Sequence, residues 1–116
     1  AQPEETGIDI YLGIGGAPEG VLAAAALRCI GGQMQGRLVP ANSNMTRNAS
    51  TAARRQERKY TLEEMASGDV MFAATGVTDG SLLKGVIFGT GWIETETVVM
   101  RSATGTVRWI RNRRRV

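Results

Sequence analysis

The sequence predicts an α/β fold: a layered mixed sheet with flanking helices, and an antiparallel meander in the C-terminal half. First, 116 residues with 42% hydrophobic content and 15 glycines suit one modest domain with many tight connections. Second, a run of helix-forming residues from Val21 to Ile30 follows a β-prone segment. Third, the last part of the chain consists of β-prone segments separated by glycine. We therefore expect a single α/β domain over residues 1–116.

The N-terminal part has the pattern of a strand, a glycine turn and a helix. Ile8 to Ile14 alternates as "IDIYLGI", which predicts a short strand. Pro18 lies where the helix should begin, because proline suits the first helical turn. The apolar run ends at Gly31-Gly32, a strong C-terminal stop for a helix.

The middle of the chain is more polar. The stretch "QMQGRLVP" is compatible with a second strand, interrupted by Gly36 and ended by Pro40. Ala41 to Tyr60 shows no steady apolar period, so we expect an exposed, mobile loop over residues 41–60. Thr61 then predicts the start of a short helix, because Glu64 stands at the right spacing for a capping box.

The C-terminal half is rich in strand signals. "DVMFAATGV" is a β-type run, and the following "TDG" is a turn signal. "GVIFG", "WIETETVVMR" and "GTVRWIRN" predict three more strands, which would form the antiparallel meander. The arginines that follow are expected to be a charged tail beyond the last strand.

Composition excludes several kinds of chemistry. The chain has no histidine, and its single cysteine, Cys29, has no activating partner nearby in the sequence. This argues against Cys-His and Ser-His nucleophiles, so any catalysis would use carboxylates and a metal. One cysteine also excludes an internal disulfide, which favours a cytoplasmic location. No apolar run approaches the roughly 18 residues that a membrane span needs.

The glycine-rich turn "GIGGAPEG" is neither of the two common phosphate-binding motifs. A P-loop needs Lys-Ser or Lys-Thr where this chain has Pro18-Glu19. A dinucleotide fingerprint needs a third glycine where this chain has Pro18. What stays possible is a helix start whose free N–H groups favour an anion. Glu19 in that first turn either stabilises the helix dipole or binds a metal ion.

The charged residues leave two further alternatives open. The net charge is +3, and arginines cluster in Arg54 to Lys59 and in Arg108 to Arg115. The second cluster, with Trp109 for stacking, suits nucleic acid, but a solvated face and tail is the simpler interpretation. Glu94 and Glu96 would share one face of a strand, where they either bind a cation or contact solvent.

Three long strings identify a known family. "GIGGAPEGVLAAAALRCIGGQMQGRL", "FAATGVTDGSLLKGV" and "VVMRSATGTVRWI" closely resemble the C-terminal part of class II fructose-1,6-bisphosphatases, including bifunctional fructose/sedoheptulose bisphosphatases. These enzymes belong to the metal-dependent, lithium-sensitive phosphatases. The resemblance runs from about Gly7 to Arg111, apart from the Ala41 to Tyr60 stretch.

The resemblance implies a part of a sugar-phosphatase fold and a role for two residues. Glu19 would bind one of the catalytic divalent ions, Mg²⁺ or Mn²⁺, and the backbone of Gly16 would contact the sugar bisphosphate. Family members are around three times this length. The other metal ligands would lie in a missing N-terminal portion. The catalytic residues would lie there too, so we expect no catalytic residue within this chain.

We therefore expect a metal-dependent hydrolase of the 1-phosphate of fructose 1,6-bisphosphate, and possibly of sedoheptulose 1,7-bisphosphate. It would be cytoplasmic and homo-oligomeric, with no nucleic-acid or membrane partner. The alternatives are a basic nucleic-acid-binding module and a structural subunit without a catalytic role.

Overall fold

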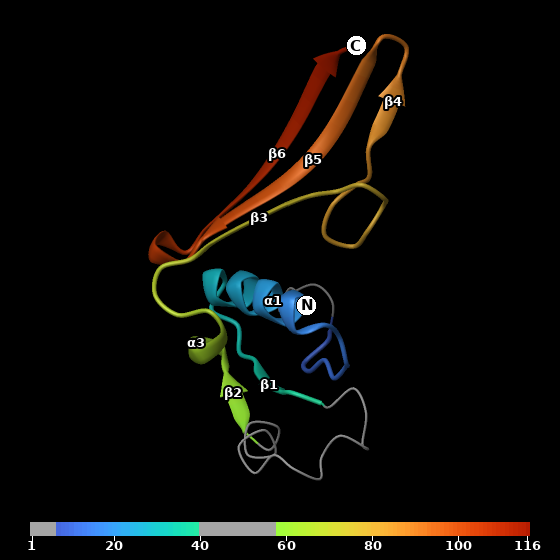
Figure 1. The fold of residues 1–116 in the computed structure, drawn as a ribbon. Coiled ribbons are helices and arrows are strands. Elements are labelled where there is room, and N and C mark those ends of the chain that lie inside the picture. Colours follow the sequence, from blue (N-terminus) through green and yellow to red (C-terminus); the bar gives the residue numbers. More distant parts are fainter. Residues whose placement is uncertain (1–6, 40–57) are drawn as a thin grey trace.

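A computed structural model describes residues 7–39 and 58–116 (Figure 1). Residues 41–57 of the expected loop therefore lie outside the described residues. In chain order the elements are α1 (Ala17–Cys29), β1 (Gln35–Arg37), β2 (Lys59–Thr61), α3 (Leu62–Met65), β3 (Met71–Thr75), β4 (Ile87–Gly89), β5 (Trp92–Arg101), the 3-10 turn η2 (Ser102–Thr104) and β6 (Thr106–Arg115).

The strands form a two-stranded sheet, β1 with β2, and a larger sheet of four strands centred on β5. All ten residues of β5 pair with β6 along one edge. On the other edge β3 pairs with the end of β5 and β4 with its beginning. Every described pairing is antiparallel, and β4, β5 and β6 follow one another as a meander. The predicted α/β class and the C-terminal meander are confirmed.

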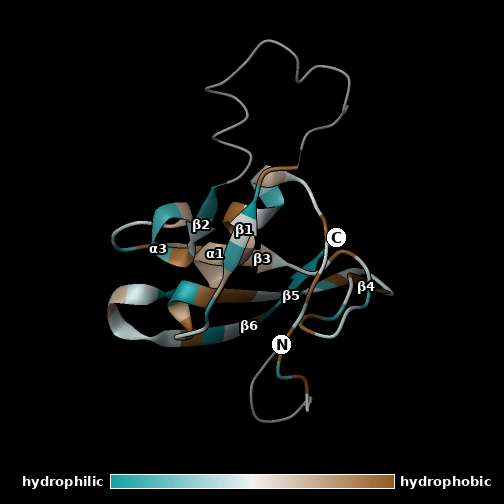
Figure 2. Ribbon diagram, turned by 90° about the horizontal axis from the view of Figure 1, so that it is seen from below, coloured by the Kyte–Doolittle hydropathy of each residue, from teal (hydrophilic) through white to brown (hydrophobic). Residues whose placement is uncertain are grey.

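Helix α1 begins and ends where the sequence indicates. Pro18 stands in its first turn, and Gly31, just after its end, has a φ of 74° that favours glycine. The helix packs against β3 and β5, and the hydrophobic core lies between them. Figure 2 shows this layer of helix against strand with apolar residues in brown. The buried side chains of the core are Cys29, Leu83, Val98 and Met100.

The short helix α3 is held by the expected capping box. The Thr61 hydroxyl accepts the backbone N–H of Glu64, and the Glu64 carboxylate accepts the backbone N–H of Thr61. This backbone bond lowers the pKa of Glu64, and the ion pair with Arg58 lowers it further. The carboxylate therefore stabilises the helix at neutral pH, and this contribution is lost on acidification through the lowered pKa.

Three sequence predictions about elements are wrong. Residues 8–14 form no strand, because no described strand pairs with them. Lys59 and Tyr60 belong to β2 rather than to a loop, because they pair with β1. The last strand extends to Arg115, because its arginines continue the register with β5. Each error concerns a pairing between segments that are distant in the sequence.

Among the described residues, no helix is long and apolar enough to cross a membrane.

Candidate functional site

The first turn of α1 presents backbone groups suited to an anion. Gly16 is the N-cap residue, with φ −66° and ψ 149°, and no side chain caps this end of the helix. Its carbonyl accepts the N–H of Gly20 at 3.0 Å, which begins the helical bonding. The first N–H groups of a helix have no partner within it, and the helix dipole adds partial positive charge there. This end of α1 can therefore attract a phosphate or a carboxylate.

Glu19 folds back over Gly16. A Cβ placed on Gly16 would overlap Oε2 of Glu19, so the side chain in this orientation needs a glycine at the N-cap. The Glu19 side chain is exposed. The structure thus brings together the two residues that the sequence singled out, with an exposed carboxylate directly beside an N-cap that has no side chain.

The donor set at this site is small. Within residues 7–39 and 58–116, no group of three or more histidine, cysteine, aspartate or glutamate side chains is placed to hold a metal ion. Mg²⁺ and Mn²⁺ prefer oxygen ligands and six-fold coordination, and the Glu19 carboxylate is an oxygen donor of this kind. The site therefore fits such an ion as one ligand of a larger set.

Two carboxylates accept backbone hydrogen bonds from the segment between β3 and β4. Asp79 accepts the backbone N–H of Gly85 at 2.9 Å, as expected for a turn residue. Glu96 accepts the backbone N–H of Lys84 at 2.7 Å. Both carboxylates therefore order the loop over the sheet.

Glu94 has a structural role that the sequence analysis did not predict. It is only 8% exposed, and it forms ion pairs with Arg113 at 2.8 Å and with Arg111 at 3.4 Å. The pairing register explains the contact, because Glu94 lies opposite Arg113 on β6. The idea that Glu94 and Glu96 form a solvated pair is wrong, since both carboxylates are engaged within the protein.

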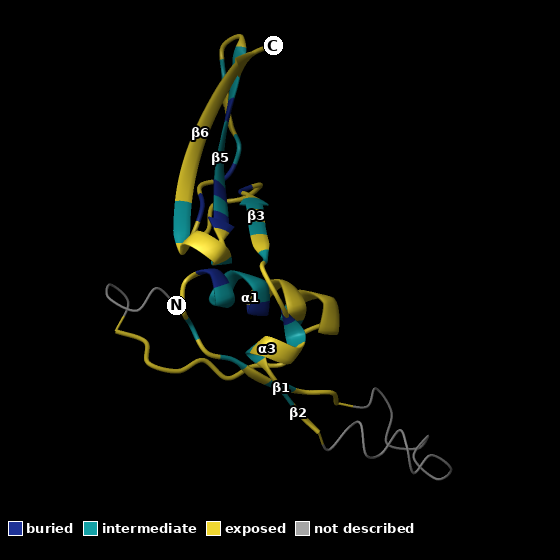
Figure 3. Ribbon diagram, turned by 90° about the vertical axis from the view of Figure 1, so that its left-hand side faces the viewer, coloured by how far each residue is buried: buried dark blue, intermediate teal, exposed yellow. Residues whose placement is uncertain are grey.

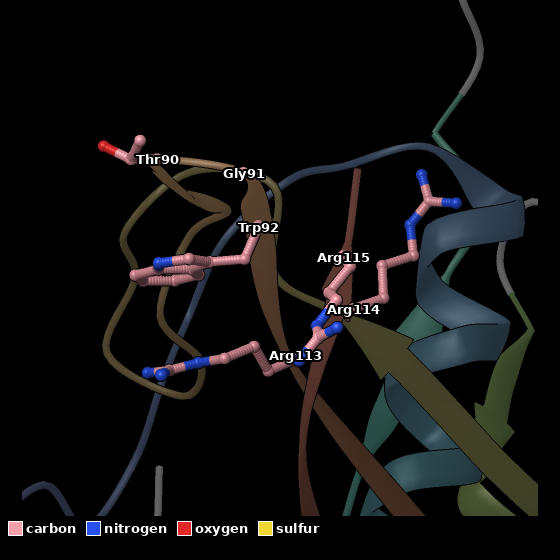
Figure 4. Close-up of a pocket in the computed structure, with 6 residues that line it drawn as sticks. All are labelled: Thr90, Gly91, Trp92, Arg113, Arg114 and Arg115. Carbon is pink, nitrogen blue, oxygen red and sulfur yellow. The ribbon is translucent and has the colours of Figure 1, made fainter.

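The turn between β4 and β5 and the end of β6 form a shallow hollow of about 350 Å³ (Figure 4). The Arg113 guanidinium stacks on Trp92, 4.1 Å from the ring centroid. A Cβ on Gly89 would overlap the same ring, so Trp92 lies directly on the backbone of β4. Stacking and ion pairing thus hold Arg113 in place. The hollow is lined by Thr90, Gly91, Trp92, Arg113, Arg114 and Arg115.

We expect Arg113→Ala to lower the free energy of unfolding by about 1–2 kcal/mol, because it leaves Glu94 with Arg111 alone and uncovers Trp92. Arg114→Ala is the control, since Arg114 has no ion pair among the described residues, and its change should stay within about 0.5 kcal/mol. Urea unfolding of both variants checks this. Equal stabilities would show that the ion pair and the stacking contribute nothing.

Cys29 is buried under the sheet, where its Sγ lies 3.7 Å from the carbonyl of Val70. Burial raises the pKa of the Cys29 thiol. A protonated thiol in the core is a poor nucleophile. Cys29 is therefore part of the core and poorly placed to act as a nucleophile.

The chain was compared with known proteins. The model of the family described as bacterial fructose-1,6-bisphosphatase, glpX-encoded, matches residues 1–114. Relatives named D-fructose 1,6-bisphosphatase class 2/sedoheptulose 1,7-bisphosphatase are similar over 90% of the chain. They come from Synechococcus sp. strain JA-3-3Ab (42% identical), Gloeobacter violaceus (40%) and Synechocystis sp. strain PCC 6803 (39%).

The family model and the named relatives place this sequence among bacterial bisphosphatases. The chain belongs to the glpX-encoded bacterial fructose-1,6-bisphosphatase family. It spans about a third of the length of the curated relatives it matches.

Proposed function

We propose that this chain forms the C-terminal part of a class II bisphosphatase that hydrolyses the 1-phosphate of fructose 1,6-bisphosphate. The names of the relatives support this substrate, and they make sedoheptulose 1,7-bisphosphate a second one. The observation that carries the proposal is the exposed Glu19 carboxylate folded over Gly16 at a helix start, in a chain of this family.

Glu19 serves as one ligand of a catalytic Mg²⁺ or Mn²⁺. Such an ion, when bound, activates a water molecule and neutralises charge on the phosphoryl oxygens. Gly16 acts through its backbone, because the absence of a side chain lets the bisphosphate approach. The start of α1 favours the negative charge of that ligand through its N–H groups and dipole.

The remaining metal ligands and the catalytic residues come from the upstream two thirds of the enzyme. One carboxylate cannot hold an ion that needs six ligands, and the described residues form no group of three or more histidine, cysteine, aspartate or glutamate side chains that could hold it. The complete enzyme is a cytoplasmic homo-oligomer in this proposal.

A basic nucleic-acid-binding module is the second candidate, favoured by one observation. Trp109 is 51% exposed on β6, in the strand that carries the arginines. We give the bisphosphatase precedence because Arg111 and Arg113 are engaged with Glu94. Tight duplex or single-strand binding at physiological salt would reverse this order.

The proposed function is tested with a chimera, in which this chain replaces the matched segment of the Synechocystis relative. The isolated chain should release no phosphate from fructose 1,6-bisphosphate, with or without Mn²⁺, whereas the chimera should release it in a metal-dependent reaction. Metal-dependent hydrolysis by the isolated chain, once mass spectrometry excludes contaminants, contradicts the proposed division of the site. A chimera that is folded but inactive contradicts the assignment of this chain to the enzyme.

A further inference from the structure

The segment before α1 carries unusually exposed apolar side chains. Exposure is 74% for Ile10, 85% for Leu12 and 90% for Ile14. The first turns of α1 continue this surface with Val21 at 47% and Leu22 at 58%. Figure 3 shows the whole segment leading into α1 as exposed. We call these five residues the N-terminal apolar surface.

Scattered apolar residues on a surface are ordinary, but a contiguous apolar patch marks an interface. The N-terminal apolar surface brings five exposed apolar side chains into 13 consecutive positions of the chain, which is more than single scattered residues.

We propose that the upstream two thirds of the enzyme dock on the N-terminal apolar surface and so fix the position of Glu19. This inference rests on the proposed function, and it adds the surface through which the two parts meet. The occupant follows from length. The chain covers only 34% of the length of its relative, and the remaining part of the enzyme has to contact this part somewhere. The exposed face along β6 carries five arginines, so it suits burial against an apolar partner less well.

Docking there has a direct consequence for the site. Ile14 is separated from Glu19 only by Gly15, Gly16, Ala17 and Pro18. A Cβ on Gly15 would meet nothing within 4 Å, so the backbone at this turn is open to a neighbour. Covering Leu12 and Ile14 immobilises the turn, and the carboxylate is then held against ligands from the other part. The surface therefore couples assembly to metal binding.

The first test is co-purification of this chain with the tagged upstream portion of the Synechocystis relative. Leu12→Asp should lose the association, because it places a charge in the apolar contact. Phe88→Asp is the matched control: Phe88 is 76% exposed on β4 and is not one of the five residues of the surface, so the variant should associate like the unmodified chain. Because Leu12 is exposed in this chain, thermal unfolding of the isolated Leu12→Asp variant should be unchanged.

A second measurement decides the matter where the separate parts fail to associate. In the chimera, the amides of residues 10–14 should exchange hydrogen at least roughly tenfold more slowly than in the isolated chain. Equal exchange, or association of Leu12→Asp as tight as that of the unmodified chain, overturns the proposal. So does a dimer of the isolated chain that Leu12→Asp abolishes, because a second copy is then the occupant. These readouts need no phosphatase activity, so an inactive chimera with protected amides would contradict only the proposed function.

Discussion

Glu19→Gln in the chimera should lower Mn²⁺-dependent phosphate release by roughly a hundredfold or more. Even groups that only support a metal ligand cost about 10–100-fold when removed, and a direct ligand should cost at least as much. The amide is a poor ligand for a hard cation, although it has nearly the shape of the carboxylate. Stability should fall by less than about 1 kcal/mol, because the side chain is exposed and only its interaction with the helix dipole is lost.

Glu63→Gln is the matched control for this variant. Glu63 is also an exposed glutamate in the first turn of a helix, and its only ion pair, among the described contacts, is with Arg28. Its removal should leave turnover unchanged. If Glu19→Gln retains at least half of the turnover at limiting Mn²⁺, with an unchanged melting temperature, the carboxylate serves only the helix and the chain is a structural part of the enzyme.

The second large effect concerns Gly76, a buried residue just after β3. Gly76→Ala should lower the free energy of unfolding by about 3 kcal/mol, because overpacking of a tight site costs this much. The new Cβ would overlap the carbonyl oxygen of Lys84 and lie 3.1 Å from Cβ of Leu83. The backbone of Lys84 cannot move away freely, since its N–H is bonded to Glu96.

Gly20→Ala is the control for added volume. A Cβ at Gly20 meets nothing within 4 Å, and the residue lies inside α1. Alanine is the better helix former, so this variant should be more stable by up to about 1 kcal/mol. Urea unfolding of the two isolated variants gives both values. A Gly76→Ala variant as stable as the parent would mean that the loop over β3 is not packed as described.

Local signals in the sequence were sufficient for the helices. Proline at the start and glycine at the end delimit α1, and the capping box of Thr61 and Glu64 gives the start of α3. These features depend on residues within one turn of each other. Likewise, the β-prone segment "WIETETVVMR" was sufficient to predict β5, which buries Val98 and Met100 in the core.

Features that depend on distant partners were missed or misjudged. Glu94 and Arg113 are 19 residues apart, and only the register of β5 with β6 brings them together. The same register turns an expected tail into strand as far as Arg115. Residues 8–14 have the pattern of a strand, but the described chain forms no strand there. Sequence periodicity reports the tendency of a segment, whereas pairing needs a neighbour.

At the candidate site, too, local features could be predicted from the sequence, whereas the function of the site could not. The glycine turn and Glu19 could be selected from helix-start chemistry, and the structure places Gly16 and Glu19 in contact. The role of Glu19 as a metal ligand rests on the family, because one carboxylate beside a helix start is equally suited to stabilising the dipole.

Calorimetric titration of Mn²⁺ into the metal-free chimera and its Glu19→Gln variant tests the role of Glu19 most directly, because it needs no turnover. If Glu19 is a ligand, the Kd for Mn²⁺ should rise at least about tenfold in the variant, while Glu63→Gln keeps the parent value. An equal Kd in all three proteins would show that Glu19 does not bind the metal.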